Sequence, residues 1–307
     1  MSVAVVGDTT LDVTVRPYEP PRPGADVPAS ITIAPGGQGA NVAVRLARAG
    51  VAVRLATAIA DDAAGRLLLA ALESEGVALQ RMRAASSGTV VALLDPAGER
   101  AMLSDRVTLE PATVVGACAG ASWVHCSAYP LADDTTGDAL AATLGSLPGG
   151  TRISAGGGSL PPDSERASRV RERLATARVS VLLLGRDEAA ALLDVPLPSM
   201  AAAADALSRT FPAAIAVVTG GAAGSAAAGP GFALSVPAQD PSTPMVDATG
   251  AGDAYAAALI GALLDKAWPP DVARLRAAME AGSRAGGLVS RVLGAQGRIA
   301  GEPGGFG

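Results

Sequence analysis

The chain contains 307 residues, of which 49% are apolar and only 3% aromatic, and it carries a formal net charge of −5 at pH 7. This length and apolar content suit one large domain with a sizeable core, whereas the scarcity of aromatic residues and of basic runs argues against nucleic-acid binding. The single lysine, Lys266, excludes P-loop and protein-kinase phosphate sites, and a single histidine, His125, with only two cysteines excludes zinc sites rich in His or Cys.

Neither a targeting segment nor a membrane-spanning segment is evident. Residues 1–8 lack a basic start and soon reach a turn, and no uninterrupted apolar run is long enough to cross a bilayer. We therefore expect a cytoplasmic protein that has neither a membrane nor a nucleic acid as its partner.

The N-terminal part of the chain mixes short strands with helices that end at glycines. An apolar strand at residues 3–6 ends at Gly7, and a Pro-rich loop at 18–25 separates strands expected at 11–15 and 30–34. The other elements expected before residue 105 are a helix at 41–49, a strand at 51–59, a helix at 63–75 and strands at 77–81, 89–94 and 100–104, the last two joined by a turn at 95–99.

Beyond residue 110, buried strands alternate with helices, which predicts an α/β fold of three layers with a mostly parallel central sheet. One of these strands contains His125, which we interpret as a core residue rather than a catalyst. The expected strands are 123–127, 152–155, 179–184 and 214–218, the helices are 135–144, 165–176, 186–193 and 201–210, and a hairpin at 225–236 precedes long helices at 252–267 and 271–290.

The strand pairs within 11–34 and 88–104 do not fit this alternation. We expect them to form a small β-sheet that projects as a lid from a single domain spanning residues 1–307. A lid over the strand ends of an α/β domain excludes water from a reaction. Its exposed edges favour pairing with a second copy, which predicts a homodimer.

The segment from Asp247 to Asp253, which reads Asp-Ala-Thr-Gly-Ala-Gly-Asp, is the most informative in the chain. It opens a long apolar helix, so its backbone N–H groups and the positive end of the helix dipole suit an anion such as a phosphoryl group. A carboxylate beside such a site repels the anion, and an obvious reason for its presence is to take a proton from a hydroxyl that attacks phosphorus. We therefore expect Asp253 to be a general base, and the alternative is a purely structural helix cap.

A second glycine-rich turn precedes the first expected helix. Its glycines allow a ligand to approach the backbone closely, and the amide of Asn41 can bond two hydroxyls. Two alternatives stay open, namely a plain turn with a capped helix and a dinucleotide fingerprint in which Val42 replaces the third glycine. The candidate ligand-binding residues of this turn are Gly36, Gly37, Gln38 and Asn41.

Three further positions carry polar groups or glycines near strand ends. Asp12 could accept hydrogen bonds from two vicinal hydroxyls of a sugar, although an aspartate in a turn is more often simply solvated. Thr219, with Gly221 and Gly224, follows an apolar strand whose end can hold a nucleotide. Glu188 could orient water on a magnesium ion, or it could be a surface charge of its helix.

In this order, these segments resemble the ribokinase-like carbohydrate kinases, also called the PfkB family. The resemblance spans nearly the whole chain and is most specific from Asp247 to Asp253 and from Gly36 to Asn41. Further matches are Thr219 with Gly221 and Gly224, Asp12, the turn 95–100 with Gly98, Glu99 and Arg100, Glu188, and the triplet Gly294, Ala295 and Gln296.

The resemblance implies ATP-dependent phosphorylation of a hydroxyl on a small sugar or nucleoside. Asp253 would be the base, beside an anion hole formed by the backbone of Gly250, Ala251 and Gly252. Because a helix N-terminus stabilises an ionised carboxylate, we expect a lowered pKa for Asp253. Asp253 would then be a weak base, and a weak base is sufficient for a reaction in which the hydroxyl proton leaves late. The resemblance further implies that the acceptor is bound by Asp12, Gly36, Gly37, Gln38 and Asn41. It implies that ATP is bound by Thr219, Gly221, Gly224 and Thr249. Glu188 would bind Mg²⁺ through water, and Asp247, beside Thr249, would bind an activating K⁺.

The chain departs from the family pattern at three places, one of which is Ser127 to Tyr129, where ribokinases often have an acidic residue after the central strand. Gly185 stands three residues before Glu188, where the family has asparagine, and Gly156, Gly157 and Gly158 replace an Asp-Pro-Asn element. A non-catalytic sugar or nucleoside sensor on the same fold is therefore one alternative, which predicts ligand binding without ADP release. A dinucleotide-dependent oxidoreductase is the other, and it leaves the glycine-rich segment near residue 250 unexplained.

Overall fold

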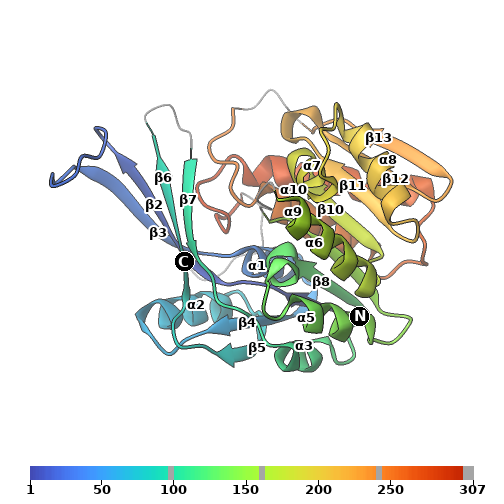
Figure 1. The fold of residues 1–307 in the computed structure, drawn as a ribbon, viewed down its shortest axis with the longest axis horizontal. Helices are drawn as coiled ribbons and strands as arrows, with labels where there is room; N and C mark the ends of the chain where they lie inside the picture. The colour runs from blue at the N-terminus through green and yellow to red at the C-terminus, as the bar shows by residue number, and fades with distance from the viewer. Residues whose placement is uncertain (96–99, 159–162, 240–243, 300–307) are drawn as a thin grey trace.

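The strands separate into a large central sheet and a small second sheet (Figure 1). The computed structural model describes residues 1–95, 100–158, 163–239 and 244–299. In this part of the chain the central sheet has the order β13-β12-β11-β10-β9-β8-β1-β4-β5, and its strands are parallel except at β11-β12 and β12-β13. Its strands are β1 (Ser2–Val6), β4 (Ala52–Ile59), β5 (Ala78–Arg83), β8 (Trp123–Ser127), β9 (Arg152–Gly156), β10 (Val181–Gly185), β11 (Ile215–Thr219), β12 (Ser225–Gly229) and β13 (Phe232–Val236).

Helices cover both faces of the central sheet. Along β1, Val3 and Val5 belong to one buried cluster and Ala4 and Val6 to the other, because successive side chains of a strand point to opposite faces. The first cluster is covered by α1 (Gln38–Arg48), α2 (Ala63–Ser74), α9 (Ala251–Leu263) and α10 (Val272–Val289). The second is covered by α3 (Pro111–Cys118), α4 (Ala128–Ala132), α5 (Gly137–Gly145), α6 (Ser164–Thr176), α7 (Arg186–Leu193) and α8 (Met200–Thr210). The predicted three-layer α/β/α fold is thus confirmed.

The small sheet projects from the body as the expected lid (Figure 1). Its strands lie in the order β3-β2-β6-β7, and they arise from the two regions in which the sequence predicts extra strands. Residues 96–99 of the predicted turn lie outside the described part of the chain. The lid strands are β2 (Thr10–Pro17), β3 (Ala29–Gly36), β6 (Gly88–Leu94) and β7 (Arg100–Asp105).

One face of the lid is apolar across all four strands. Val13 pairs with Ile33 on one side and with Val91 on the other, and Val91 pairs with Leu103. Paired residues of neighbouring strands share a face, so these side chains form one row, in which Ile33 is 56% and Leu103 63% exposed. The opposite face carries Met102 and therefore faces the cavity described below.

Three helices differ from the sequence-based expectation. The helix expected at 252–267 ends at Leu263, because residues 265–267 are exposed and offer no apolar side for packing. Helices α3 and α4 were not among the predicted elements, although Pro111 at the first position of α3 is a recognised start signal. None of the helices in the described ranges is long and apolar enough to cross a membrane.

The N-terminus of α1 packs directly on the end of β1. A Cβ atom on Gly39 would lie 2.6 Å from the Cα of Gly7, and a Cβ on Gly7 would lie 2.7 Å from the Cα of Gly39. Only glycine at both positions allows this approach. The contact brings the glycine-rich turn before α1 to the carboxyl end of the central sheet, where α/β folds bind ligands.

Candidate active site

Asp253 lies in the first turn of α9, whose N-terminus is capped by Gly250. Gly250 has φ 79° and a Cβ there would lie 2.6 Å from Ala295, so both conformation and space require glycine. The N–H of Ala251 donates to the carbonyl of Ala248 (3.2 Å), whereas Gly252 is exposed at the mouth of the helix. The predicted anion-binding backbone is therefore positioned beside the predicted base, with Gly252 as its most open member.

Two amide side chains from α1 hold the carboxyl group of Asp253. Asn41 Nδ2 donates to Asp253 Oδ2 at 2.8 Å, and the side chain of Gln38 lies close enough to lower the pKa of the same carboxyl. Any side chain at position 157 would collide with the amide of Gln38, so Gly157 provides the space for this contact. The structure thus brings Gln38 and Asn41 to Asp253 across the interface of α1 and α9.

The pKa of Asp253 is raised, which overturns the sequence-based expectation of a lowered value. Burial raises the pKa of Asp253 to about 7, and the carboxylates of Asp8 and Glu188 add to the increase, whereas Asn41 and Gln38 lower the pKa. The residue keeps some exposure toward a cavity, but its carboxyl group is surrounded by protein, and desolvation outweighs the helix dipole. A base whose pKa is close to neutral pH matches the requirement of general base catalysis.

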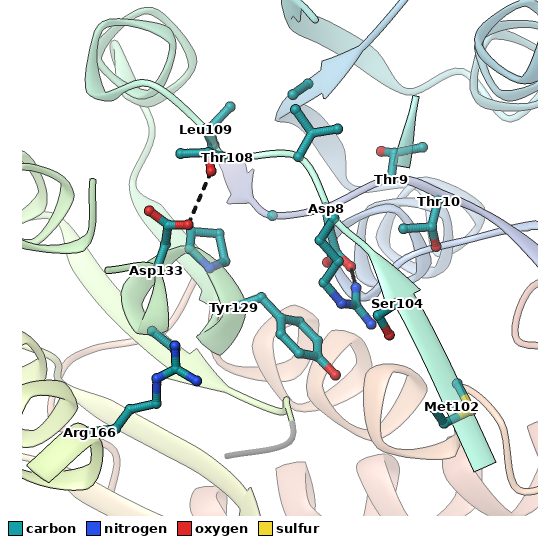
Figure 2. Close-up of a pocket in the computed structure, with 16 residues that line it drawn as sticks. Asp8, Thr9, Thr10, Met102, Ser104, Thr108, Leu109, Tyr129, Asp133 and Arg166 are labelled. Carbon is teal, nitrogen blue, oxygen red and sulfur yellow. Dashed lines mark hydrogen bonds and ion pairs between the residues drawn. The ribbon is translucent and has the colours of Figure 1, made fainter. Parts of the chain in front are cut away.

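A large cavity of about 440 Å³ opens between the lid and the body (Figure 2). Asp8, at the end of β1, forms an ion pair with Arg106, which follows β7, and the Arg106 guanidinium lies 3.7 Å from the ring centre of Tyr129. These three side chains join the lid strand to the body and line the cavity together with Thr10. None of them is among the acceptor residues that the family resemblance implies, and the ion pair joins positions 98 residues apart.

The predicted acceptor residues Asp12, Gly36 and Gly37 do not line this cavity directly. Asp12 lies within lid strand β2, which contains the strand expected at 11–15 and pairs with β3 from Thr10 onward. Its carboxylate packs against Gly36 and accepts a hydrogen bond from Thr10 Oγ1 at 2.7 Å. Thr10, which lines the cavity, therefore connects Asp12 and Gly36 to it.

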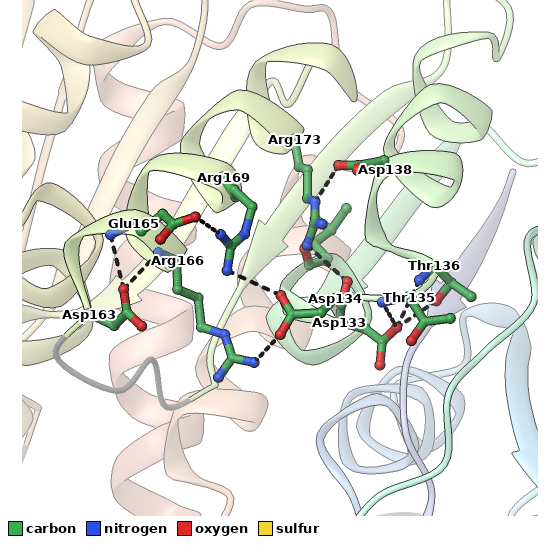
Figure 3. A network of polar contacts seen from close by, with 11 residues as sticks. Asp133, Asp134, Thr135, Thr136, Asp138, Asp163, Glu165, Arg166, Arg169 and Arg173 are labelled. Atoms are coloured by element: carbon green, nitrogen blue, oxygen red, sulfur yellow. Dashed lines mark hydrogen bonds and ion pairs between the residues drawn. The ribbon is translucent and has the colours of Figure 1, made fainter.

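The wall of the cavity opposite the lid is stabilised by a network of charged side chains (Figure 3). Arg173, on α6, is only 4% exposed, and its Nη1 donates to the carbonyl groups of Leu131 and Asp133 at 2.9 Å each. Its Nε donates to Asp138 at 2.7 Å. Arg173 thereby fixes the end of α4, the helix that also carries Tyr129.

We expect Arg173→Met to lower the free energy of unfolding by about 2–4 kcal/mol, because one buried and one partly buried carbonyl group lose a charged donor. Arg169→Met on the same helix is the matched control: Arg169 is 38% exposed and forms only surface ion pairs, so the loss should stay below about 1 kcal/mol. Urea unfolding of both variants measures the difference. Equal losses of unfolding free energy in the two variants would show that the buried hydrogen bonds of Arg173 do not stabilise this wall of the cavity.

A second cavity of about 440 Å³ lies on the other side of the α9 N-terminus. Thr219, at the end of β11, lines it together with Gly221 and Gly224, as the sequence predicts for a nucleotide site. Arg291, after α10, also lines it and is the cation that the sequence-based assignment missed. Thr249 does not line it, because its hydroxyl donates instead to Asp247 at 2.6 Å.

A smaller cavity of about 140 Å³ contains Asp253 and Glu188. It shares Thr219, Gly252 and Tyr255 with the second large cavity, so Asp253 lies next to the predicted nucleotide site. His125 also lines it, but the side chain is 1% exposed and bonds Ser154 at 2.9 Å, in keeping with its interpretation as a core residue.

The two predicted metal-binding carboxylates already have protein partners. Glu188 Oε2 accepts from the N–H of Gly185 at 2.7 Å and closes the first turn of α7. Asp247 accepts from the N–H of Thr249 and, through Oδ2, from the N–H of Gly294 at 3.0 Å. Across the described ranges no group of three or more His, Cys, Asp or Glu side chains could hold a metal ion.

The fold defines the class of this protein. It is similar to ribokinase from Thermotoga maritima, with a TM-score of 0.78, 18% identity and coverage of 98% of this chain and 97% of that chain. It is also similar to ribokinase from Cryptococcus neoformans var. grubii serotype A in complex with ADP, with a TM-score of 0.76, 24% identity and coverage of 96% and 95%. The architecture is thus the ribokinase fold.

The sequence then places the chain within that class. The profile of the pfkB family carbohydrate kinases matches residues 1–300, so the chain belongs to this family and is a carbohydrate kinase. A fructokinase from Klebsiella pneumoniae is 29% identical over 278 residues, which cover 85% of this chain and 87% of the relative.

Proposed function

We propose that the protein transfers the γ-phosphoryl group of ATP to a hydroxyl of a small sugar or nucleoside, with residues 1–307 acting as one domain. The observation that carries this proposal is the position of Asp253. Its carboxyl group lies in the small cavity that shares Gly252 with the nucleotide-side cavity, and Asp8 of the lid-side cavity is close enough to raise its pKa. A base at this place is positioned to act between an acceptor and a phosphate.

In the proposed reaction the acceptor hydroxyl gives its proton to the Asp253 carboxylate as its oxygen bonds to phosphorus and ADP leaves. The backbone of Gly250, Ala251 and Gly252 would stabilise the charge on the transferring group. Magnesium bound to the nucleotide would neutralise phosphate charge, with Glu188 holding it through water. Asp247 would bind an activating potassium ion beside the same helix N-terminus.

The charges of the lid-side cavity favour an uncharged acceptor. Arg106 is paired with Asp8, and Arg166 is paired with Asp134 at 2.7 Å. Asp133 also lines the cavity, and hydrogen bonds from neighbouring threonines lower its pKa against the effect of burial, so it stays ionised. An anionic acceptor would thus meet a carboxylate and two arginines that are already paired, which favours a neutral sugar. Because a fructokinase is among the relatives, fructose is the first candidate.

The test is ADP release from Mg-ATP in the presence of fructose, ribose, adenosine, a sugar phosphate and a sugar acid, with and without potassium chloride. We expect neutral sugars to release ADP fastest and potassium to increase the rate. Tight binding of a sugar without ADP release would replace the proposal with the non-catalytic sensor. A preference for the sugar phosphate or the sugar acid would overturn the assignment of an uncharged acceptor.

We further propose that two copies pair through the apolar face of the lid. The row formed by Ile33, Val13, Val91 and Leu103 is continuous, and a partly exposed apolar surface of this kind is typical of interfaces. A second lid supplies the same surface in a two-fold arrangement.

We expect Ile33→Asp to weaken the dimer by about thirtyfold or more, because it buries a charge in the proposed interface. Analytical ultracentrifugation over a range of protein concentrations measures this change. Val115→Asp, at a residue that is 57% exposed on α3, is the control and should leave association unchanged. A wild-type chain that sediments as a monomer at all concentrations would contradict the proposed dimer.

A further inference from the structure

The hydrogen bonds that hold Asp253 extend to a residue beyond α10. Gln296 Nε2 donates to Asn41 Oδ1 at 3.0 Å, and Asn41 Nδ2 donates to Asp253 Oδ2 at 2.8 Å. The three side chains come from the C-terminal loop, from α1 and from α9, and they form a line that ends at the proposed base. The proposed reaction assigns no role to Gln296.

The direction of each hydrogen bond in this line depends on the next. An ionised carboxylate can only accept, so Asn41 must turn its Nδ2 toward Asp253 when Asp253 is charged. The other end of the amide, Oδ1, can only accept as well, and it therefore requires a donor on its far side. Gln296 Nε2 is that donor. Without it, the Asn41 amide could turn over and present its oxygen to Asp253, which would favour the protonated carboxyl.

The backbone around Gln296 is held on α1 by two arginines. Arg45 Nη2 donates to the carbonyl groups of Ala295 and Gly297 at 2.9 and 2.8 Å, and Arg48 Nη2 donates to the carbonyl of Gln296 at 3.0 Å. Both arginines lie on the helix that carries Asn41, so Gln296 and Asn41 move as one unit. The loop therefore positions the side chain of Gln296 rather than leaving it to solvent.

We propose that Gln296 is a positioning residue that fixes the orientation of the Asn41 amide and thereby favours the ionised form of the Asp253 carboxyl. This inference rests on the proposed role of Asp253 as the base. Gln296 acts through Asn41 and does not itself contact Asp253 in the described hydrogen bonds.

The other groups that face Asp253 set the background for this effect. Asp8, after β1, and Glu188, on α7, are carboxylates that both raise its pKa. His125, on β8, stays neutral because burial lowers its pKa to about 4, and burial raises the pKa of Tyr255, on α9, to about 12. The side chain of Gln38 lowers the pKa of Asp253 independently of Gln296. His125 and Tyr255 therefore keep their charge states across the range in which Asp253 is expected to titrate.

The decisive variant is Gln296→Glu, which keeps the size of the side chain but replaces the donor with an acceptor. The new carboxylate accepts from Asn41 Nδ2, so the amide turns over and its oxygen faces Asp253. We expect the acid limb of the kcat–pH profile to move to a pH about one unit higher than in the wild type. At pH values below the limb, kcat should be about tenfold lower than in the wild type, and at high pH it should return to the wild-type value.

Two further variants complete the test. Gln296→Met removes the donor without adding a charge, and we expect a smaller upward shift of the same limb. Gln80→Glu makes the same chemical change on β5, where the side chain packs near Gly116 of α3, and its profile should match the wild type. A merely structural role of Gln296 would lower kcat equally at every pH.

The outcomes separate this inference from the proposed function. If Asp253→Asn abolishes turnover while the Gln296→Glu and wild-type profiles have the same acid limb, the role of Gln296 is wrong and the role of Asp253 stands. If Asp253→Asn retains ordinary turnover, the proposed base is wrong and this inference falls with it. A shifted limb in Gln296→Glu and a smaller shift in Gln296→Met support the positioning role.

Discussion

Replacement of Asp253 with asparagine is expected to lower turnover by about 10²–10⁴-fold, because the amide cannot take the proton of the acceptor hydroxyl. The wild-type rate should rise with pH through an acid limb near the pKa of Asp253, which burial raises to about 7. In Asp253→Asn the residual rate should lack this limb. Steady-state kinetics between pH 5 and 9 with saturating ATP measures both effects, and ordinary turnover in a folded variant would remove Asp253 from the mechanism.

The same substitution is expected to change stability in a pH-dependent direction. The ordinary pKa of 3.8 applies to the unfolded chain and a value of about 7 to the folded protein, so the folded state binds the proton more tightly. Wild-type stability therefore falls as the pH rises from about 4 to about 7, because a buried carboxyl must be ionised. A neutral amide at this position carries no such cost, so the variant should be more stable than the wild type at pH 8. The difference should shrink toward pH 4 in urea unfolding. A difference that is constant with pH would mean that the pKa of Asp253 is not raised.

The second large effect is expected from Gly252→Ala, which should stabilise the protein and yet impair the reaction. No heavy atom lies within 4 Å of the position that a Cβ would take on Gly252, and alanine stabilises a helix by about 0.5–1 kcal/mol relative to glycine. The same methyl group would stand at the lining of the Asp253 cavity and of the nucleotide-side cavity. We expect kcat/KM for ATP to fall by about a hundredfold, because the phosphoryl group loses its place at the helix mouth.

Gly261→Ala is the matched control for this experiment. Gly261 lies further along the same helix, and a Cβ there also has no heavy atom within 4 Å. It should gain similar stability in urea unfolding while kcat/KM stays at the wild-type value. Unchanged kinetics in Gly252→Ala, with ATP as the varied substrate, would show that the transferring phosphate does not approach α9 at this residue.

Sequence patterns predicted those features that short stretches of chain encode. The apolar run of β1, the alternation of buried strands and helices, and the lid strands were all recognised from local periodicity and confirmed by the sheet order. Local chemistry also located the turn before α9, because glycine spacing and the position of Asp253 lie within a few residues of each other. The helix expected at 252–267 was too long, since exposure of residues 265–267 depends on what packs against them.

Residues from distant parts of the chain could not be assembled by the same reasoning. Asn41 and Asp253 are 212 positions apart, and Gln296 and Asn41 are 255 apart, so no spacing rule connects them. The Asp8–Arg106 pair beside Tyr129 exists only because the lid returns to the body at that point. The contact of the Asp12 carboxylate with Gly36 likewise depends on the pairing of β2 with β3, which is a long-range contact.

The amino-acid sequence by itself determined the α/β class, the lid, the family and the segment that carries the proposed base, because hydrophobic periodicity and glycine-rich turns act over a few residues. Tertiary structure alone decided the proton affinity of Asp253. The sequence favoured a lowered pKa from the helix dipole, whereas the packing of α1, α7 and α9 buries the carboxyl and raises its pKa. Desolvation depends on every atom that surrounds a group, and those atoms come together only when the chain is folded.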